Sequence, residues 1–373
     1  MNNINLTLKI ERAISELRRG GKIVITDNVK NLSILLTPAE LIQDDTVGQF
    51  LNLAKSRPNI LLSANRCKAI GLNTDNKPCS ILINKQWTSS DIMSVCLPLS
   101  NQKRPEISGV ISESATGIAS SCLLILRQAR LLPAAIISLI GHIPVENVRD
   151  WSFKNNLIHV DLEDIVIYEK VSAESLVMEV KANVPLTYTD KCEIVMFRPR
   201  DGGHEHFCLI FGKTREIQKS SRYNPLVRIH SQCITGDILG SLKCDCGEQL
   251  KHSIKMMADA DEGVLVYLAQ EGRDIGLLNK LRAYSLQERG MDTVQANEDL
   301  GFNDDERLYY PAKQMLSQLQ ISQVRLITNN PKKVEHLNNL GINITERIPI
   351  KIKPNKHNKN YLNTKSKRSG HLL

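Results

Sequence analysis

The chain has 373 residues, of which 42% are hydrophobic and 24% are charged, so it is long enough for two domains that each bury a core. Aromatic residues make up only 4%, which argues against an aromatic stacking surface for single-stranded nucleic acid. The net charge of +8 comes almost entirely from residues 351–373, which hold seven basic and no acidic residues. We therefore expect a solvated basic tail without a specific nucleic-acid partner, the alternative being a tail that attracts phosphate or RNA.

No segment has the features of a membrane span or a secretion signal. The longest apolar run, Leu131–Ile140, is shorter than the roughly 18 residues that a transmembrane helix needs. The first nine residues are polar and lack the apolar core of a signal peptide. We expect a cytoplasmic protein with no membrane partner.

The first half alternates between helix and strand patterns. Apolar residues recur at helical spacing from Ile10 to Leu17, and Gly20-Gly21 ends this predicted helix. Further predictions are a buried strand at 22–26, a helix through 122–127, and a strand followed by a short helix over 156–170. A new alternating pattern starts soon afterwards, so we expect a domain boundary near 171–176.

The second half has denser signals. We expect strands at 194–197, 207–211, 264–268 and 324–328, and helices at 247–260, 276–289 and 305–319. The first two strands flank a glycine-containing loop and predict a hairpin, whose His204 and His206 should face solvent. Strands that alternate with helices predict an α/β or α+β domain. Beyond Pro349 there is little periodicity.

Three of the nine cysteines lie close together in the sequence. Cys233, Cys244 and Cys246 have the spacing C-x10-C-x-C, whereas the other six are isolated and are expected to be small core residues. Three converging thiols can bind zinc, and three protein ligands with a fourth position open are typical of a catalytic site. The alternatives are a structural zinc, for which His230 is the nearest fourth ligand, and a chance cluster.

Polar and cationic residues gather after the predicted strands of the second half. The segments are Arg228–Asp237, Gln270–Lys280, Asp304–Arg307 and Thr328–Lys333. Strand-to-helix turns suit anionic ligands, because free N–H groups and the helix dipole point outward there, and Arg and Lys add the charge that a polyphosphate needs. The alternatives are a solvated helix start at Lys332-Lys333 and a favourable acidic cluster at a helix N-terminus for residues 304–306.

In these segments the chain resembles GTP cyclohydrolase II, the first committed enzyme of riboflavin synthesis. The resemblance runs from about residue 176 to the C-terminus and includes residues 361–365 and 370–373. It implies a hydrolase that opens the imidazole ring of GTP, releases C8 as formate and removes pyrophosphate, leaving 2,5-diamino-6-(5-phosphoribosylamino)pyrimidin-4(3H)-one. It also implies one zinc ion per chain, magnesium with the GTP phosphates, and a homodimer.

The resemblance also implies roles for individual residues. The three clustered cysteines match the family's zinc ligands, Asp305 its proton acceptor, Arg307 its nucleophile toward the α-phosphate, and Tyr284 a tyrosine that completes deformylation. The positions that match GTP-contacting residues are Arg228, Ile229, His230, Ser231, Gln232, Gln249, Glu271, Gly272, Arg273, Thr293, Thr328 and Lys333.

Two of these roles leave alternatives open. Arginine is an unusual nucleophile because its pKa exceeds about 12, so electrostatic stabilisation of the phosphoryl transition state is the alternative for Arg307. Many family members have glutamate where this chain has Gln232. An amide cannot act as a base, so base recognition at Gln232 could survive, whereas a catalytic carboxylate role there could not.

The first half resembles a second family, 3,4-dihydroxy-2-butanone 4-phosphate synthase, on residues 10–27, 38–40, 108–111 and 156–170. That family uses an acidic loop to bind divalent metal and ribulose 5-phosphate, but residues 27–34 keep only the carboxylate of Asp27. Its G-H-T-E-A run is lost as well, with Thr116 in place of His and Ile118 in place of Glu. We expect a degenerate domain that packs but does not catalyse.

The fold class that follows is a two-domain α+β/α-β protein. We expect a synthase-like α/β domain over 1–171, a GTP cyclohydrolase II-like α+β domain with a zinc site over 172–350, and a basic tail over 351–373. The alternatives in function are a bifunctional enzyme and a non-catalytic regulator that binds GTP or zinc. The lost acidic loop opposes the first, and retention of Tyr284, Asp305 and Arg307 opposes the second.

Overall fold

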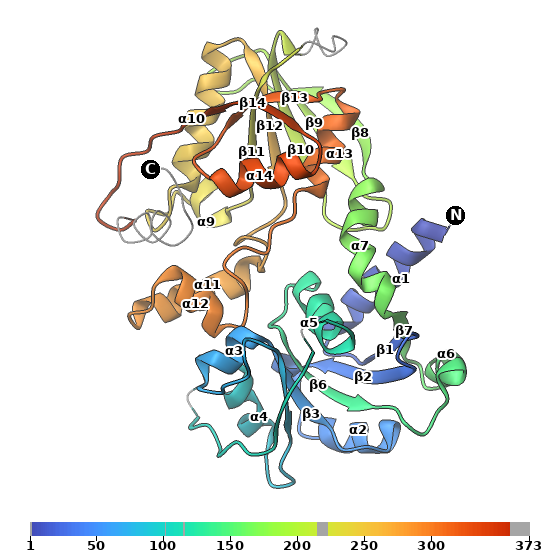
Figure 1. The fold of residues 1–373 in the computed structure, drawn as a ribbon. Coiled ribbons are helices and arrows are strands. Elements are labelled where there is room, and N and C mark those ends of the chain that lie inside the picture. The colour runs from blue at the N-terminus through green and yellow to red at the C-terminus, as the bar shows by residue number, and fades with distance from the viewer. Residues whose placement is uncertain (1, 101, 115, 215–222, 359–373) are drawn as a thin grey trace. The chain divides into compact units, whose positions relative to one another are not determined.

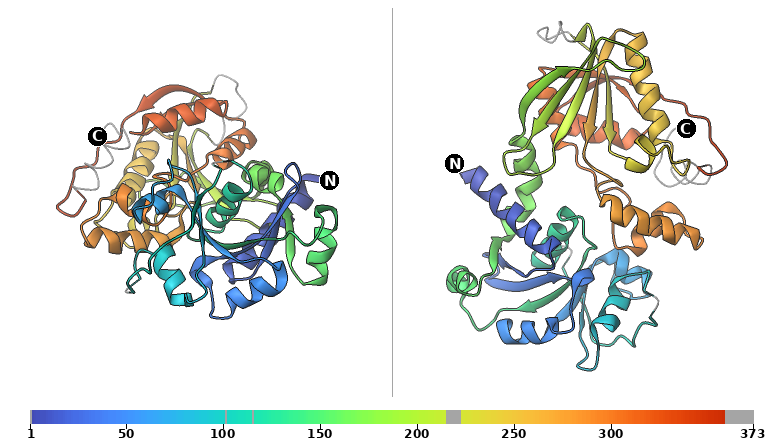
Figure 2. Two further views of the ribbon diagram at one scale, coloured as in Figure 1. Left: turned by 60° about the horizontal axis from the view of Figure 1, so that its bottom comes forward. Right: turned by 180° about the vertical axis from the view of Figure 1, so that it is seen from behind.

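The structure, a computed structural model, describes residues 2–100, 102–114, 116–214 and 223–358. The chain divides into two compact units, residues 1–168 with 278–306 and residues 169–277 with 307–373. Each unit is a seven-stranded sheet with helices packed on it (Figures 1 and 2), which confirms the two-domain α/β fold class. The motifs at 361–365 and 370–373 lie outside the described residues, and the functional limits 1–171, 172–350 and 351–373 stay predictions.

The sheet of the first unit is mostly antiparallel. Its strands, in sheet order, are β5 (Val110–Ser112), β4 (Cys79–Leu82), β3 (Asn59–Leu62), β6 (Ala134–Leu139), β2 (Leu32–Pro38), β1 (Ile23–Asp27) and β7 (Ile158–Asp161). Only β1 and β7 pair in parallel. The helices are α1 (Asn2–Arg18), the 3-10 turn η1 (Ala39–Leu41), α2 (Thr46–Ala54), α3 (Ala64–Ala69), α4 (Ser89–Cys96), α5 (Ile118–Gln128), α6 (Val145–Lys154) and most of α7 (Leu162–Glu174), α11 (Gly276–Glu288) and α12 (Thr293–Asp299).

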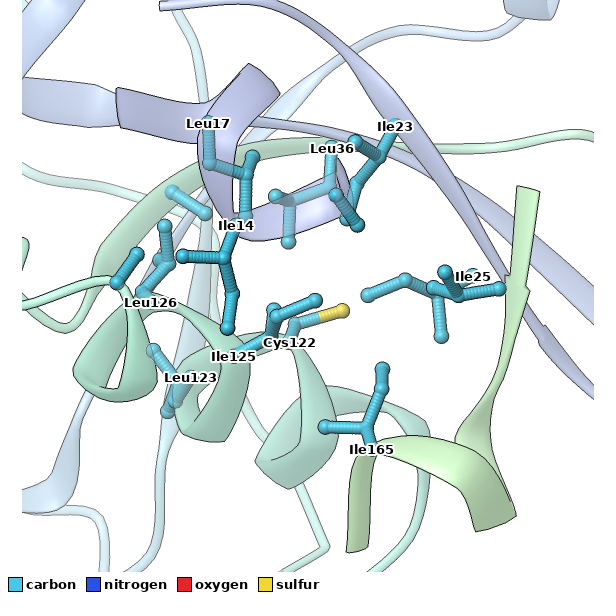
Figure 3. Close-up of a cluster of buried hydrophobic side chains, with 14 of the residues drawn as sticks. Ile14, Leu17, Ile23, Ile25, Leu36, Cys122, Leu123, Ile125, Leu126 and Ile165 are labelled. Carbon is cyan, nitrogen blue, oxygen red and sulfur yellow. The ribbon is translucent and has the colours of Figure 1, made fainter. Parts of the chain in front are cut away.

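Both faces of this sheet are buried. Successive residues of a strand point to opposite faces, so Ile23 and Ile25 enter a core with α1 and α5 (Figure 3). Val24 enters a second core, which it shares with Phe50 of α2 and Ile92 of α4. Every residue of β1 is buried, which explains why the apolar run at 23–25 is continuous rather than alternating in the sequence.

The sheet of the second unit combines a parallel and an antiparallel half. Its strands, in sheet order, are β14 (Asn343–Ile348), β13 (Gln323–Ile327), β11 (Leu226–Ser231), β12 (Glu262–Leu268), β10 (His206–Gly212), β9 (Cys192–Arg198) and β8 (Val177–Asn183). The pairs from β14 to β12 are parallel, and the pairs from β12 to β8 are antiparallel. The expected hairpin is confirmed as β9 and β10.

Helices cover the two faces of this second sheet. The helices are α9 (Ile234–Asp237), α10 (Cys246–Asp259), α13 (Tyr310–Gln318) and α14 (Pro331–Asn339). One core joins α13 and α14 to Val227 and Ile229 of β11, and the other joins Met257 of α10 to Leu226. Arg228 and His230 alternate with Val227 and Ile229, so they point toward the α10 side of the sheet.

One expected helix boundary is wrong. The helix predicted over 305–319 begins only at Tyr310, and residues 305–309 have no regular secondary structure. Pro311 lies in the first turn, where its fixed φ and missing N–H are tolerated. Glu306 accepts the backbone N–H of Asn303 at 2.8 Å, so residues 304–306 are not a charge cluster at a helix N-terminus.

Two predictions on buried residues have different outcomes. All six isolated cysteines are buried, as expected. His206 is also buried, and its ring Nδ1 accepts the backbone N–H of Ala269 at 3.0 Å. The expectation that His206 faces solvent is therefore wrong, because the first residue of β10 lies inside the sheet, whereas His204 is exposed.

Within the described ranges, no helix is both long and apolar enough to span a bilayer.

Candidate zinc and nucleotide site

Three of the four predicted site segments lie at one edge of the second sheet. The chain runs from β11 to β12 on one side, and later to β13 on the other side of β11. The order therefore changes direction at β11, and α/β sheets bind ligands outside the carboxyl ends of their strands at such a switch point. The predicted segments 228–237, 270–280 and 328–333 include the residues that follow the carboxyl ends of β11, β12 and β13.

Three thiols converge just beyond β11. The Sγ atoms of Cys233, Cys244 and Cys246 lie within 4.8 Å of one another, and those of Cys233 and Cys244 are 3.7 Å apart. Two thiolates bound to one tetrahedral zinc at about 2.3 Å would be separated by about 3.8 Å. Among the described residues this cluster includes no His, Asp or Glu as a fourth ligand. The donor set and spacing therefore fit zinc with one position open.

The electrostatics of the cluster favour a cation. A hydrogen bond with Cys233 raises the pKa of the Cys244 thiol and raises that of Cys246 well above its usual range, and burial and the charges of the neighbouring thiolates add to both shifts. The backbone N–H of Gly236 donates to Cys233 Sγ at 3.3 Å. Cys246 is the first residue of α10, whose dipole favours an anion there. A divalent cation would offset the remaining repulsion.

Two glycines leave the space in which the sulfur atoms gather. A Cβ atom on Gly236 would lie 2.9 Å from Cys244 Sγ and 3.0 Å from Cys233 Sγ. A Cβ atom on Gly247 would lie 2.1 Å from the carbonyl oxygen of Gly236. A side chain at position 247 would clash with the backbone, and one at position 236 would force the sulfur atoms to shift, so glycine at both positions permits the close packing of these two turns.

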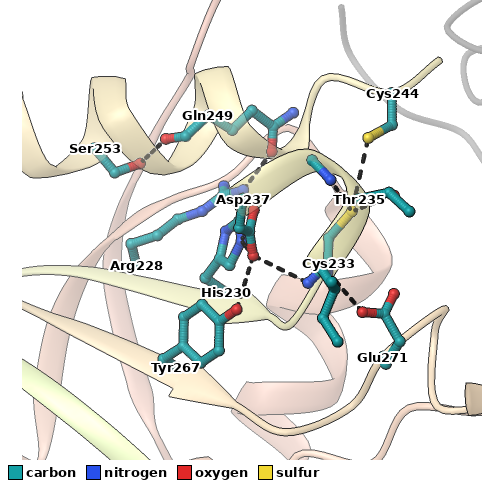
Figure 4. Close-up of polar contacts among 12 residues, drawn as sticks. Arg228, His230, Cys233, Thr235, Asp237, Cys244, Gln249, Ser253, Tyr267 and Glu271 are labelled. Carbon is teal, nitrogen blue, oxygen red and sulfur yellow. Dashed lines mark hydrogen bonds and ion pairs between the residues drawn. The ribbon is translucent and has the colours of Figure 1, made fainter. Parts of the chain in front are cut away.

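Asp237 organises the residues around Cys233 (Figure 4). Its buried carboxylate accepts the backbone N–H of Cys233 at 3.0 Å, the hydroxyl of Tyr267 at 2.8 Å, and a ring N–H of His230 at 3.1 Å. Burial lowers the pKa of His230, opposed by its bond to Asp237, so the ring is a neutral donor. The ring of His230 is therefore already hydrogen-bonded to Asp237. The hypothesis that His230 completes a structural zinc site is not favoured.

Arg228 connects the end of β13 to α10. Its Nη1 donates to the carbonyl of Ile327 at 3.0 Å, and its Nη2 donates to the Gln249 side chain. The amide of Gln249 in turn donates to Asp245 at 2.5 Å. Burial lowers the pKa of Arg228, opposed by the charge of Asp245 and reinforced by that of Arg307. A guanidinium remains charged despite such a shift, so a buried positive charge lies close to the thiol cluster.

The turn after β12 combines a buried carboxylate with unusual backbone conformations. Glu271 is 3% exposed and accepts the backbone N–H of Ile234, next to Cys233, at 2.6 Å. Gly272, Arg273 and Asp274 have φ values of 65°, 61° and 74°. The left-handed region is unfavourable for the two non-glycine residues, and such conformations concentrate at functional sites.

The turn after β13 places Lys333 inside the protein. Lys333 is 6% exposed, donates to the carbonyl of Ile229 at 3.1 Å, and lies 5.3 Å from the ring centre of Tyr309. Asn330 caps α14 by accepting the N–H of Lys332, and Thr328 Oγ1 accepts the N–H of Asn330. Lys332 is exposed. A solvated helix start therefore describes Lys332 but not Lys333.

Several buried polar atoms at this edge are available for a ligand. Arg228 Nε, Ser231 Oγ and Gln270 Oε1 have no hydrogen-bond partner among the residues that the structure describes. Buried polar groups are nearly always paired. A bound nucleotide, which carries both donors and acceptors, would satisfy such atoms.

The structure groups the predicted site residues by compact unit. The three cysteines and the predicted residues in 228–232, 271–273, Gln249, Arg307, Thr328 and Lys333 belong to the second unit. Tyr284, in α11, Thr293, at the start of α12, and Asp305 belong to the first unit. The individual roles of all these residues stay predictions.

The sequence interpretation assigned no role to Asp237, Tyr267 or Gly236. Asp237 lies four residues after Cys233, which is the spacing of one helical turn, and this signal could have been noticed. Tyr267 could not have been found, because its contact depends on the parallel register that pairs it with His230. The importance of Gly236 could not have been found either, because it depends on the positions of the sulfur atoms beside it.

Comparison with known proteins agrees with this geometry. The family model described as GTP cyclohydrolase II matches residues 177–349. GTP cyclohydrolase-2 of Azospirillum brasilense is 37% identical over 98% of this chain and 94% of its own length. Riboflavin biosynthesis protein RibBA of Phocaeicola vulgatus is 34% identical over 98% of this chain and 97% of its own.

A solved two-domain 3,4-dihydroxy-2-butanone 4-phosphate synthase, RibBX from A. baumannii, covers 91% of this chain and 98% of its own at 14% identity, but its TM-score of 0.37 is too low to carry an argument. The expected fusion of the GTP cyclohydrolase II region to an N-terminal domain is confirmed by the two relatives, whose alignments extend through both halves. The chain belongs to the GTP cyclohydrolase II family.

Proposed function

We propose that this chain hydrolyses GTP to 2,5-diamino-6-(5-phosphoribosylamino)pyrimidin-4(3H)-one, formate and pyrophosphate, the first step of riboflavin biosynthesis. The observation that carries the proposal is the three-thiol cluster at the carboxyl end of β11, beside the buried cations Arg228 and Lys333. A soft-metal site next to a cationic, N–H-rich edge suits hydrolytic chemistry on a nucleoside triphosphate.

The second unit supplies the groups that would hold the nucleotide. Arg228, Lys333 and the N-terminus of α14 provide positive charge and N–H donors for the phosphates. Gln232 continues from β11, with its backbone N–H bonded to the carbonyl of Leu268 at 2.8 Å. Its amide can both donate and accept, which suits recognition of a guanine edge. Magnesium would accompany the triphosphate.

The reaction requires water at two electrophilic centres. Zinc held by the three cysteines would supply Lewis-acid activation of water at neutral pH. Water adds at C8, the C8–N9 or N7–C8 bond of the imidazole ring breaks, and a second water releases the formyl group as formate. Asp305 would accept a proton during ring opening, and Tyr284 would assist deformylation, as the family resemblance implies.

Arg307 would act at the phosphates. Burial is the main cause of the lowered pKa of Arg228, and the charge of Arg307 adds to it, so the two guanidinium groups lie near enough to interact. A third water attacks the α-phosphorus, the α–β phosphoanhydride bond breaks, and pyrophosphate leaves. Two neighbouring cations suit a role in stabilising the negative charge that develops in this step. We therefore favour the electrostatic role over nucleophilic attack by Arg307.

The N-terminal unit would not catalyse synthase chemistry. The carboxylate of Asp27 accepts the backbone N–H groups of Val29 and Lys30 at 3.1 and 2.9 Å, so it is used to form a turn. Thr116 and Ile118 replace the histidine and glutamate of the family run. Homodimer assembly, which rests on the family resemblance, and a cytoplasmic location, which rests on the sequence pattern, complete the proposal.

The test is a product analysis of purified full-length protein with GTP, magnesium and zinc. We expect the diaminopyrimidine, formate and pyrophosphate in equal amounts. The matched control is Cys244→Ser, which should release no formate while remaining folded. Tight GTP binding without any product would contradict the proposal and favour the regulator hypothesis.

A further inference from the structure

A segment from the middle of the matched family region belongs structurally to the N-terminal half. The family model covers 177–349, yet residues 278–306 pack with residues 1–168 as one compact unit. Segment 278–306 carries Tyr284, Thr293 and Asp305, which are three of the predicted site residues. The contacts that hold segment 278–306 in place therefore affect residues on which the proposed reaction depends.

Arg66 is the central anchor of segment 278–306. The side chain is 3% exposed, and its Nη1 donates to both the backbone carbonyl and the carboxylate of Asp299, each at 2.9 Å. Its Nε donates to the carbonyl of Val95 in α4 at 3.0 Å. Arg66 thus ties the end of α12 to the core of the synthase-like domain by a charged pair shielded from water, where such interactions are strong.

The start of α3 and its N-cap Ser63 add bonds to the next residues of the segment. Ser63 Oγ donates to the carbonyl of Gly301 at 2.7 Å, and Asn65 donates to the carbonyl of Phe302 at 2.8 Å. Phe302 is fully buried. Gly301 has φ of 92°, and a Cβ there would lie 2.8 Å from Ser63 Oγ. The two segments of the chain approach so closely here that only glycine fits at position 301.

A second anchor holds α11. Glu40 is 3% exposed in its side chain, accepts the backbone N–H of Leu132 at 2.7 Å, and pairs with Arg282 at 2.5 Å. Arg282 also donates to Asn279, and fully buried Asn279 donates to the carbonyl of Arg130 at 2.9 Å. This network fixes the helix that carries Tyr284.

A third contact lies next to Asp305. Arg127 of α5 is 3.5 Å from the carboxylate of Glu306, and the same carboxylate closes the turn at Asn303. The anchors therefore reach both ends and the middle of segment 278–306, and they come from η1, α3 and α5 of the N-terminal half.

We propose that the degenerate synthase-like half works as a positioning scaffold for segment 278–306, with Arg66 and Glu40 as positioning residues for GTP turnover. The inference rests on the proposed function for its catalytic consequence. Loss of an anchor should misplace Asp305 and Tyr284, and displacements of about 1 Å can slow an enzyme by about 100-fold. The scaffold explains why packing residues of this half persist although its catalytic residues are lost.

The experiment compares full-length variants by hydrogen exchange and by GTP kinetics. Arg66→Met removes the central anchor, and Asn65→Ala removes one bond with less risk to folding. Arg57→Met is the arginine control, because Arg57 donates to the carbonyl of Ile83 and, among the residues that the structure describes, forms no hydrogen bond to segment 278–306. Phe50→Leu is the stability control, because Phe50 lies in the core of the same unit.

We expect peptides within 278–306 of Arg66→Met to exchange at least tenfold faster than in wild type, with a smaller change for Asn65→Ala. The kcat should fall about tenfold for Arg66→Met, with KM for GTP and zinc content within twofold. Both controls should keep the wild-type kcat at a temperature where they are folded.

Unchanged exchange in 278–306 would overturn the scaffold. Faster exchange with an unchanged kcat, or an equal loss of kcat in Phe50→Leu, would overturn the positioning role. If wild-type protein formed no product from GTP, the proposed function and the positioning role would both fall. The exchange comparison would still decide whether the N-terminal half holds the segment.

Discussion

Alanine at position 236 should disturb zinc binding without touching a ligand. The added Cβ would lie 2.9 Å from Cys244 Sγ, 3.0 Å from Cys233 Sγ and 3.1 Å from Cys246 Cβ, whereas ordinary contacts begin near 3.4 Å. The sulfur atoms of Cys244 and Cys233 would therefore have to move away from the added Cβ by about 0.5 and 0.4 Å. Metal–ligand distances tolerate about 0.2 Å, so the displaced thiols would no longer match a tetrahedral zinc.

The expected loss follows from that mismatch. Disturbing the surroundings of metal ligands typically lowers metal affinity by about 10- to 100-fold, which corresponds to about 1.4 to 2.7 kcal/mol. The thiols themselves remain, so binding should weaken rather than vanish. Cys244→Ser, which removes a ligand, should weaken it further.

The assay is zinc competition against a chromophoric chelator, with far-UV circular dichroism as the check on folding. Gly141→Ala is the matched control, because a Cβ on Gly141 would meet nothing within 4 Å. We expect wild-type zinc affinity for Gly141→Ala. Folded Gly236→Ala with a zinc Kd within twofold of wild type would refute the proposed geometry of the sulfur cluster.

Three further predictions concern Asp237, His159 and the N-terminal unit. Asp237→Asn should lower zinc affinity by about 10- to 100-fold, because the amide weakens the hydrogen bonds that hold the Cys233 backbone and Tyr267. Chelator competition measures the zinc affinity of this variant, and a wild-type value would contradict the prediction. Burial lowers the pKa of His159, so the folded state favours the neutral ring. Stability should then be complete above the ordinary pKa of about 6.5 and decline as pH falls through it toward the folded pKa. His159→Asn should flatten the decline in denaturant midpoint from pH 7.5 to 5.5, and an unchanged slope would count against this. The full-length protein should form no 3,4-dihydroxy-2-butanone 4-phosphate from ribulose 5-phosphate at any magnesium concentration, and product detected by mass spectrometry would show that the loop after Asp27 was misinterpreted.

The fold was predictable from the sequence where local patterns were strong. Apolar periodicity from Ile10 to Leu17 corresponds to the buried face of α1, and the runs at 264–268 and 324–328 correspond to β12 and β13. Helix 305–319 was misplaced at its start, because acidic residues before a helix resemble its first turn and only the position of Pro311 indicates the true boundary.

Contacts between distant segments could not be predicted. Sequence spacing indicated the convergence of Cys233 with Cys244 and Cys246, because a short loop joins them. The assignment of residues 278–306 to the N-terminal unit depends on Arg66 and Glu40, which are more than 200 positions away from their partners. Buried charges of this kind leave no periodic signal, since a single arginine in a short helix is typical of an exposed surface.

The most direct test of the account follows the C8 carbon of GTP. Zinc-loaded protein incubated with [8-¹³C]GTP and magnesium should convert the labelled carbon to free [¹³C]formate, detected by carbon NMR. The same protein stripped of zinc, and Cys244→Ser, should leave the label in GTP. Labelled formate from zinc-free protein, or none from fully zinc-loaded wild type, would contradict the assignment of the thiol cluster to GTP ring opening.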